Sequence, residues 1–353
     1  MQHDPEHEAP VRRPNAVMPL PPLDGAGLPA PVDGAPPAAD PQPDTVAQAA
    51  DPVEPAPRPD GWRGSFAWGV VRALRPRQWV KNVLVLAAPL ASGRIFELEV
   101  LSATFVAFVL FCAVSSGIYL VNDSVDAEED RRHPVKRFRP IAAGIVPRSL
   151  ALTLAVVLFV GALGVAALVT RPELAWVLGV YVVLQLAYCL ALKQQPVIDL
   201  AIVASGFLLR TVAGGVGAGI AISQWFLLVA AFGSLFMVAG KRYSELVAIG
   251  EGAATRKSLR EYSASYLRFV WSMSAAVTVT VYSLWAFEIG ETQDGVPWAA
   301  ISIAPFVLGL MRNAVDLDKG EAGEPEDVVL HDKVLLGLGV VWLVTVALGV
   351  FGG

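Results

Sequence analysis

The stretch Asn122–Asp130, with the sequence NDSVDAEED, directly follows a long apolar run and is rich in oxygen donors. On a helix, at about 100° per residue, four of its side chains fall on one face together with the phenol of Tyr119. These four are Asn122, Asp123, Asp126 and Asp130. Carboxylates this close repel one another unless a cation lies among them. Oxygen donors of this kind suit a hard ion, so the pattern predicts a Mg²⁺ site.

A basic run follows the acidic stretch at once and comprises Arg131, Arg132, Lys136, Arg137 and Arg139. Carboxylates for a metal beside cations for phosphate oxygens are what a Mg²⁺-diphosphate needs. The plainer interpretation is a solvated helix end with ordinary acidic residues. The adjoining cations favour the functional interpretation.

The composition indicates an integral membrane protein. The 353 residues are 54% hydrophobic and 17% charged, with a mean hydropathy of +0.53. Residues 1–60 hold 16 of the 26 prolines and no long apolar run, which predicts a disordered tail rather than a signal peptide. Residues 61–74 alternate aromatic and arginine side chains and predict an interfacial amphipathic helix. Cys112 and Cys189 lie inside apolar runs and are interpreted as packing thiols.

Residues 75–353 form the predicted membrane domain, with nine transmembrane helices and an all-α fold. The first span begins at Arg75 and ends near Ala91. The further apolar runs are 101–121, 149–169, 174–192, 196–217, 224–240, 266–288, 297–315 and 334–352. Of the 27 Lys and Arg residues, only Arg94 and Arg171 lie in loops on the second side. The positive-inside rule therefore predicts a multi-pass protein of the plasma membrane whose N-terminus and candidate site face the cytoplasm.

Several cations lie at or inside the predicted spans. Lys241 and Arg242 end the sixth span and Lys193 ends the fourth, where each could be a topological anchor or a snorkelling side chain. Arg210 lies well inside an apolar helix, and an intramembrane arginine is expected to face a cavity and an anion. Lys81 lies about one turn inside the first span, so the same argument applies to it more weakly.

The motif Asn122-Asp-x-x-Asp126-x-x-x-Asp130 on the second predicted helix, with Arg139-Pro140 and Ala143-Gly144 after it, resembles the UbiA superfamily of intramembrane prenyltransferases. The likeness covers roughly residues 70–352. It implies helices around a central cavity open to lipid, and Mg²⁺ that binds a diphosphate. In one respect the chain departs from the family pattern. Where a second Asp-x-x-x-Asp motif is typical, after the sixth helix, it has Lys241, Arg242 and Glu245, which indicates a more anionic substrate.

The stretches Arg75–Asn82, His133–Pro140 and Gly240–Glu245 resemble one branch of that superfamily. The resemblance implies a glycosyltransferase that moves 5-phosphoribosyl from 5-phosphoribosyl 1-diphosphate to decaprenyl or another polyprenyl phosphate, in precursor synthesis for cell-wall arabinan. It implies Mg²⁺ at Asn122 and Asp126, with Asp123 and Asp130 close by, and Asp123, Asp126 and Asp130 as the catalytic carboxylates. The implied contacts of the phosphoribosyl diphosphate are Lys81, Tyr119, Lys136, Arg137 and Arg139, and those of the polyprenyl phosphate are Lys193, Arg210, Lys241 and Arg242.

Two other functions compete with this interpretation. A conventional aromatic prenyltransferase of the same superfamily predicts the second aspartate-rich motif that this sequence lacks. A transporter of anionic lipids would use intramembrane cations such as Arg210, but it gives no reason for the acidic stretch and predicts inverted repeats. No nucleic-acid partner is expected. The sequence leaves the prenyl chain length open, and it leaves open whether the protein is a homo-oligomer.

Overall fold

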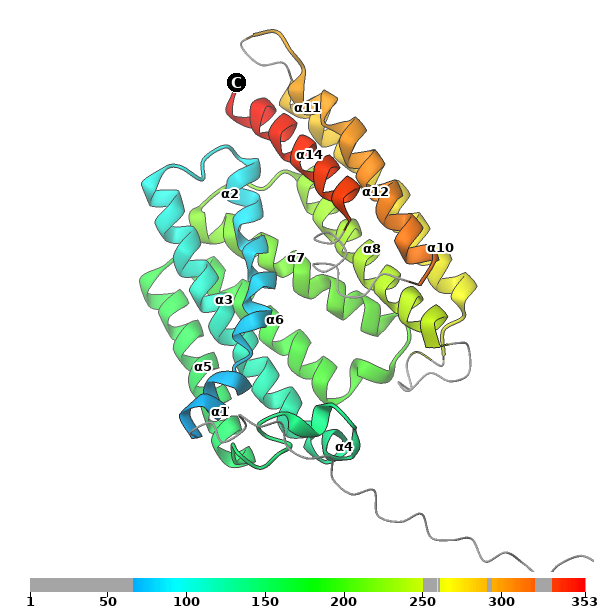
Figure 1. Ribbon diagram of the computed structural model, residues 1–353. Helices are drawn as coiled ribbons and strands as arrows, with labels where there is room; N and C mark the ends of the chain where they lie inside the picture. The colour runs from blue at the N-terminus through cyan, green and yellow to red at the C-terminus, as the bar shows by residue number, and fades with distance from the viewer. Residues whose placement is uncertain (1–65, 250–258, 260, 291–293, 321–331, 353) are drawn as a thin grey trace, which may run out of the picture. The chain divides into compact units, whose positions relative to one another are not determined.

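The computed structural model describes residues 66–249, 259, 261–290, 294–320 and 332–352. The chain divides into the units Met1–Pro59 and Asp60–Gly353, and all of the described residues belong to the second. The predicted disordered tail, residues 1–60, lies outside the described residues. Within those ranges the chain is helical and contains no strand, as predicted (Figure 1).

Eight helical segments of the described chain are long and apolar enough to cross a membrane. They are α3 (Leu98–Val125), α5 (Arg148–Val169), α6 (Pro172–Leu190), α7 (Ile198–Ala218), α8 (Gln224–Ile249), α10 (Ala264–Ile289), α11 with α12 (Trp298–Ile301 and Ile303–Asp318) and α14 (Lys333–Phe351). Each contains or closely matches one predicted apolar run. The first predicted span is not among the eight. It consists of a 3₁₀ helix, η1 (Pro76–Leu86), followed by the short α2 (Ala87–Ala91).

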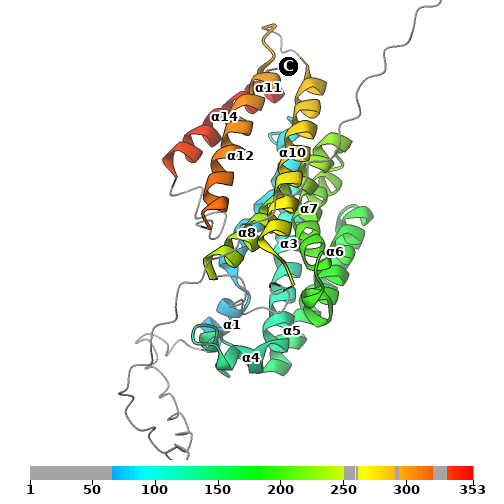
Figure 2. The ribbon, with the colours of Figure 1, turned by 90° about the vertical axis from the view of Figure 1, so that its right-hand side faces the viewer.

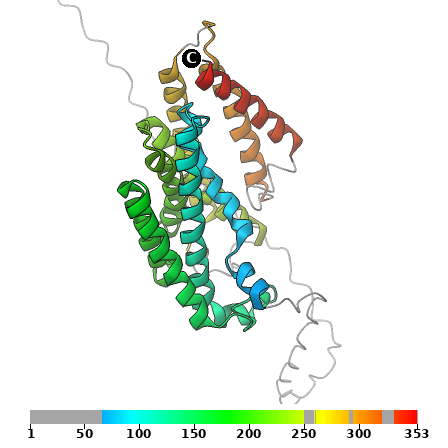
Figure 3. The same cartoon turned by 90° about the vertical axis from the view of Figure 1, so that its left-hand side faces the viewer.

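Helix α3 lies at the centre of the bundle. Of an apolar 18-residue stretch of α3, 67% is buried within the protein, whereas only 17% of the corresponding stretch is buried in α5 and in α14. Helix α3 packs against α5, α6 and α7, and α8 packs against α7 and α10 (Figures 2 and 3). The outer helices turn leucine and valine side chains outward, as lipid contact requires. The carboxyl end of α3, which carries the acidic motif, is thus held by packed helices.

Helix α1 (Phe66–Ala73) is the described part of the predicted interfacial helix. It buries Gly69 and Ala73 and exposes Phe66 and Trp68, which is the amphipathic pattern expected at a membrane surface. The short helix α4 (Ala127–Arg132) lies at the same end of the bundle as α1 (Figures 1 and 3). The location of α1 at a membrane surface stays a prediction.

The broken segment η1 is wedged between α3 and α7. Trp79 Nε1 donates to Ser116 Oγ at 3.0 Å, and Asn82 Nδ2 donates to Ser115 Oγ at 3.2 Å. On the other side, Arg210 Nε donates to Asn82 Oδ1 at 2.8 Å. Polar side chains that would be costly in lipid are therefore satisfied by neighbouring helices, which permits an irregular backbone at this depth.

The close approach of η1 to α7 depends on Gly214. A Cβ atom at this position would lie 1.7 Å from the carbonyl oxygen of Val85, so a side chain here has to displace backbone. We expect Gly214→Ala to destabilise the protein by at least about 3 kcal/mol, the upper range for overpacking, because backbone cannot rotate away as a side chain can.

The thermal unfolding temperature in detergent measures this effect. Gly161→Ala is the matched control, because Gly161 is exposed on α5 and its added Cβ would meet no atom within 4 Å. An unchanged unfolding temperature for Gly214→Ala would mean that η1 does not pack against α7 in this way.

Candidate functional site

Two carboxylates of the acidic motif are buried and joined to arginines. Asp123 accepts hydrogen bonds from Arg75 Nη2 at 2.6 Å and from Arg75 Nε at 3.2 Å, a bidentate pair. Arg139 Nη1 lies 2.6 Å from Asp130 Oδ2 and 3.3 Å from Asp123 Oδ1, so this arginine bridges the two. The carboxylate side chains are only 3% and 4% exposed. Their predicted mutual repulsion is thus relieved by two arginines within the protein.

Asp126 is placed differently from the other two aspartates. It is the single residue between α3 and α4, and its side chain is 22% exposed. Lys193 Nζ, from the 3₁₀ turn η3 (Leu192–Gln194), donates to Asp126 Oδ1 at 2.5 Å. The half-buried Asn122 lies one turn earlier on the same helix. Lys193, predicted to bind the polyprenyl phosphate, therefore meets the acidic motif.

The oxygen donors at the end of α3 suit a magnesium ion whose remaining ligands come from substrate phosphates and water. The described residues contain no group of three His, Cys, Asp or Glu side chains arranged to hold a metal ion among themselves. Asp123 and Asp130 are buried and bound by arginines. Asp126, by contrast, is partly exposed, contacts Lys193 through one oxygen, and lies one turn from the half-buried Asn122. One amide and one carboxylate oxygen fit Mg²⁺, which commonly takes few protein ligands and completes its octahedron with substrate phosphates and water.

The cluster is linked through Arg75 and α4 to three more residues predicted to contact the phosphoribosyl diphosphate, namely Tyr119, Lys136 and Arg137. The guanidinium of Arg75 lies 5.0 Å from the ring centre of Tyr119, which links the phenol to the Arg75–Asp123 pair. Lys136 and Arg137 form the short turn η2 (Lys136–Phe138), which contacts α4. Nε of Arg137 is buried and has no hydrogen-bond partner among the described residues. That donor is suited to an anion that the protein itself does not supply.

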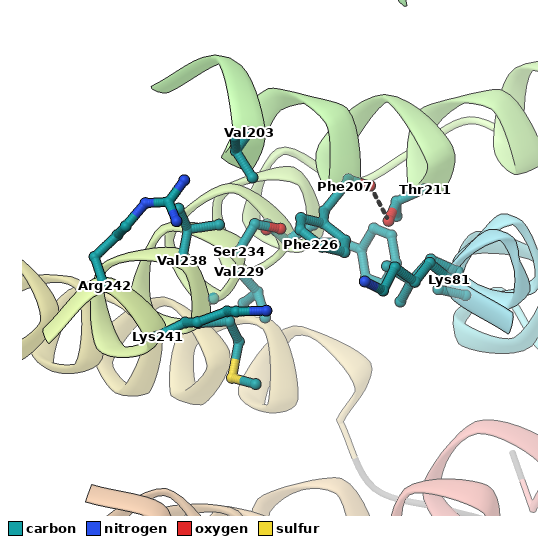
Figure 4. Close-up of a pocket in the computed structure, with 15 residues that line it drawn as sticks. Lys81, Val203, Phe207, Thr211, Phe226, Val229, Ser234, Val238, Lys241 and Arg242 are labelled. Carbon is teal, nitrogen blue, oxygen red and sulfur yellow. Dashed lines mark hydrogen bonds between the residues drawn. The ribbon is translucent and has the colours of Figure 1, made fainter. Parts of the chain in front are cut away.

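A cavity of about 570 Å³ lies between η1, α7 and α8 (Figure 4). Its walls are mainly apolar and include Val203 and Phe207 of α7 and Phe226, Val229 and Val238 of α8. Three cations also line it, namely Lys81 of η1 and Lys241 and Arg242 of α8. Figure 4 shows Lys81 and Lys241 extending from opposite sides into the same hollow. An apolar cavity with basic side chains fits a lipid that carries an anionic head.

Arg210 does not line this cavity. Its guanidinium donates to Asn82 Oδ1, to the carbonyl oxygen of Gly206 at 2.6 Å and to the hydroxyl of Tyr181 at 3.2 Å. The rings of Phe111, Tyr181 and Phe207 also surround it, with centroids 5.1–5.6 Å away. Its place inside an apolar helix predicts an anionic partner, but the structure supplies neutral acceptors and aromatic faces. Arg210 thus joins η1 to α6 and α7, apart from the cavity lining.

The cluster and the cavity are joined through η1. Arg75 caps η1 at the acidic cluster, and Lys81, six residues later, lines the cavity. At about 2.0 Å per residue in a 3₁₀ helix, this separation is roughly 12 Å along the axis. Sequence reasoning missed Arg75 as the main partner of Asp123, although it lies in the same polar segment as Lys81.

A helical membrane bundle that combines an acidic motif, several cations and an apolar cavity defines the class of intramembrane enzymes acting on anionic lipids. The chain belongs to the UbiA prenyltransferase family, whose family model matches residues 83–331.

Known proteins resemble the chain over most of its length. It is 55% identical over 292 residues to decaprenyl-phosphate phosphoribosyltransferase of Mycobacterium tuberculosis, covering 81% of this chain and 95% of that protein. The protein of the same name from Corynebacterium glutamicum is 51% identical over 292 residues, covering 81% of this chain and 88% of the relative. A solved UbiA homologue from Archaeoglobus fulgidus, bound to DMAPP and Mg²⁺, has a TM-score of 0.60 at 14% identity, covering 80% of this chain and 99% of that one. The last comparison supports the fold alone.

Proposed function

We propose that this chain transfers the 5-phosphoribosyl group of 5-phosphoribosyl 1-diphosphate to a polyprenyl phosphate, decaprenyl phosphate by analogy with its relatives, at the cytoplasmic face of the plasma membrane. The observation that carries the proposal is the 51–55% identity to decaprenyl-phosphate phosphoribosyltransferases over 81% of the chain. The cavity supports it independently, because Lys241 and Arg242 line it where an aromatic prenyltransferase would have a second acidic motif.

The phosphoribosyl diphosphate is assigned to the acidic motif and the cations around it. Asn122 and Asp126 would hold Mg²⁺, which supplies charge neutralisation for the leaving diphosphate. Lys136 and Arg137 donate to the remaining phosphate oxygens, with Tyr119 and Lys81 in reach of the same ligand. Asp123 and Asp130 act on this ligand through the arginines that they orient, Arg75 and Arg139.

The polyprenyl phosphate is assigned to the cavity. Lys241 and Arg242 pair with its phosphate, and the prenyl chain lies along the apolar walls of α7 and α8. A phosphate oxygen of the acceptor, already ionised at pH 7, forms the new bond to C1 of the ribose as the bond from C1 to diphosphate breaks. The attacking oxygen carries no proton, so the reaction requires no general base.

We expect the double variant Lys241→Ala with Arg242→Ala to raise KM for polyprenyl phosphate about a hundredfold, because two charge-assisted contacts to phosphate are lost. KM for the phosphoribosyl diphosphate should change much less. Steady-state kinetics in detergent with each substrate varied in turn measure both effects. Arg268→Ala is the control, since Arg268 is a 56% exposed cation of α10 that pairs with Asp318. Unchanged kinetics would return Lys241 and Arg242 to the role of topological anchors.

One assay separates the proposed reaction from its nearest rival. Purified protein with Mg²⁺ is given either 5-phosphoribosyl 1-diphosphate and polyprenyl phosphate, or a prenyl diphosphate and an aromatic acid. Release of diphosphate from the first pair alone is the expected result. Release from the second pair alone would identify an aromatic prenyltransferase.

A further inference from the structure

The cavity arginine Arg242 faces a fully buried carboxylate, Asp199, in the first turn of α7. Arg242 Nε and Asp199 Oδ2 are 3.7 Å apart, beyond hydrogen-bond distance, and neither atom has a hydrogen-bond partner among the described residues. On its other side, Arg242 Nη1 donates to Glu245 Oε2 at 3.2 Å. Arg242 is therefore oriented by two carboxylates, and the one at Asp199 attracts it without a hydrogen bond.

Asp199 is itself held by a phenol from a distant part of the chain. The hydroxyl of Tyr262, which lies just before α10, donates to Asp199 Oδ1 at 2.5 Å. The same hydroxyl accepts the backbone N–H of Val197 at 2.6 Å. Burial and the neighbouring Asp199 carboxylate raise the pKa of Tyr262 above its ordinary value. Tyr262 thus remains a neutral hydrogen-bond donor to Asp199.

The backbone beneath this contact is strained. Val197, immediately before α7, has φ +68° and ψ −48°, the strained γ-turn conformation that β-branched residues rarely adopt. The hydrogen bond from its N–H to Tyr262 holds this turn and, with it, the start of the helix that carries Asp199. One hydroxyl therefore fixes both the backbone before Asp199 and one of its oxygens, leaving the second oxygen directed at Arg242.

We propose that Tyr262 is a positioning residue for the lipid phosphate, acting through Asp199 to orient Arg242 at the cavity. The proposal rests on the proposed function in one respect, the assignment of the acceptor phosphate to Arg242. It goes further by naming two residues, Asp199 and Tyr262, that do not line the cavity and yet set the affinity for the lipid substrate.

The test compares Tyr262→Phe, Asp199→Asn and Arg242→Gln in the full-length protein. Tyr262→Phe keeps the ring, which stacks on Tyr266 at 5.7 Å, and removes only the hydroxyl. We expect it to raise KM for polyprenyl phosphate about tenfold, the effect of one lost hydrogen bond to a charged group, and to leave KM for 5-phosphoribosyl 1-diphosphate unchanged. Asp199→Asn should act in the same direction. Tyr266→Phe is the matched control, because its hydroxyl takes no part in this chain of contacts.

A double-variant cycle separates positioning from general structural support. If Tyr262 acts through Arg242, Tyr262→Phe should have no further effect on KM for polyprenyl phosphate once Arg242 is Gln. Additive effects, or equal changes in KM for both substrates with a lowered unfolding temperature, would overturn the positioning role. A raised KM in Arg242→Gln with a normal KM in Tyr262→Phe would overturn it too while leaving the proposed function intact. A normal KM in Arg242→Gln would overturn the assignment of the lipid phosphate itself.

Discussion

Asp126→Asn is expected to lower kcat by at least about a hundredfold, the effect of losing one metal or transition-state charge contact. The substitution keeps the size of the side chain and removes its charge. Asp126 is partly exposed at the junction of α3 and α4, where its side chain pairs with Lys193. Since no buried ion pair is broken, the unfolding temperature in detergent should remain within about 2 °C of the parent value, as for other partly exposed substitutions.

The control for this experiment is Glu129→Gln, which makes the same chemical change at an exposed carboxylate three residues away. Turnover with 5-phosphoribosyl 1-diphosphate and polyprenyl phosphate should be normal in this variant. A Mg²⁺ titration adds a second readout, because Asp126→Asn should require a higher Mg²⁺ concentration for its residual activity. Wild-type turnover at the ordinary Mg²⁺ concentration would mean that Asp126 is not a ligand.

The helices were largely predictable because membrane spans are recognised by length and hydropathy, which are local properties. The irregular backbone of the first span was not predictable, because it depends on contacts with residues far away in the sequence. Pro89 has no N–H to donate to the carbonyl of Val85, so the hydrogen bonding of a continuous helix is interrupted near the junction of η1 and α2. What holds the broken segment in place is Asn82 bonded to α3 and to Arg210 of α7, 128 residues away. Such a contact cannot be predicted from the hydropathy of a segment.

The same distinction applies to the candidate site. Helical spacing places Asn122, Asp123, Asp126 and Asp130 on related faces, and they do lie at one end of α3. Their environments differ because of partners far away in the sequence, with Arg75 48 residues from Asp123 and Lys193 67 residues from Asp126. A single sequence gives no sign that two of the three aspartates are neutralised by arginines. The pattern places all four side chains at or near the metal, whereas the structure pairs Asp123 and Asp130 with arginines in a buried cluster and leaves Asp126 partly exposed.

The bridging arginine makes the second large prediction. Arg139→Met should lower the free energy of unfolding by about 3 kcal/mol, because removing one partner of a buried ion pair leaves an uncompensated charge. Asp123 retains Arg75, but Asp130, only 4% exposed, loses the arginine 2.6 Å away. Turnover should also fall sharply, since Arg139 holds in place two aspartates of the motif to which the diphosphate is assigned.

A second substitution distinguishes these two effects. In Arg139→Met with Asp130→Asn, the buried charge is gone, so most of the lost stability should return while turnover stays low. Thermal unfolding in detergent gives the first quantity, and diphosphate release gives the second. Arg132→Met, at an exposed arginine of α4, should leave both near the parent values. If Arg139→Met unfolded at the parent temperature, Arg139 would not be the charge that keeps Asp130 buried, and the two aspartates would again be candidates for the metal.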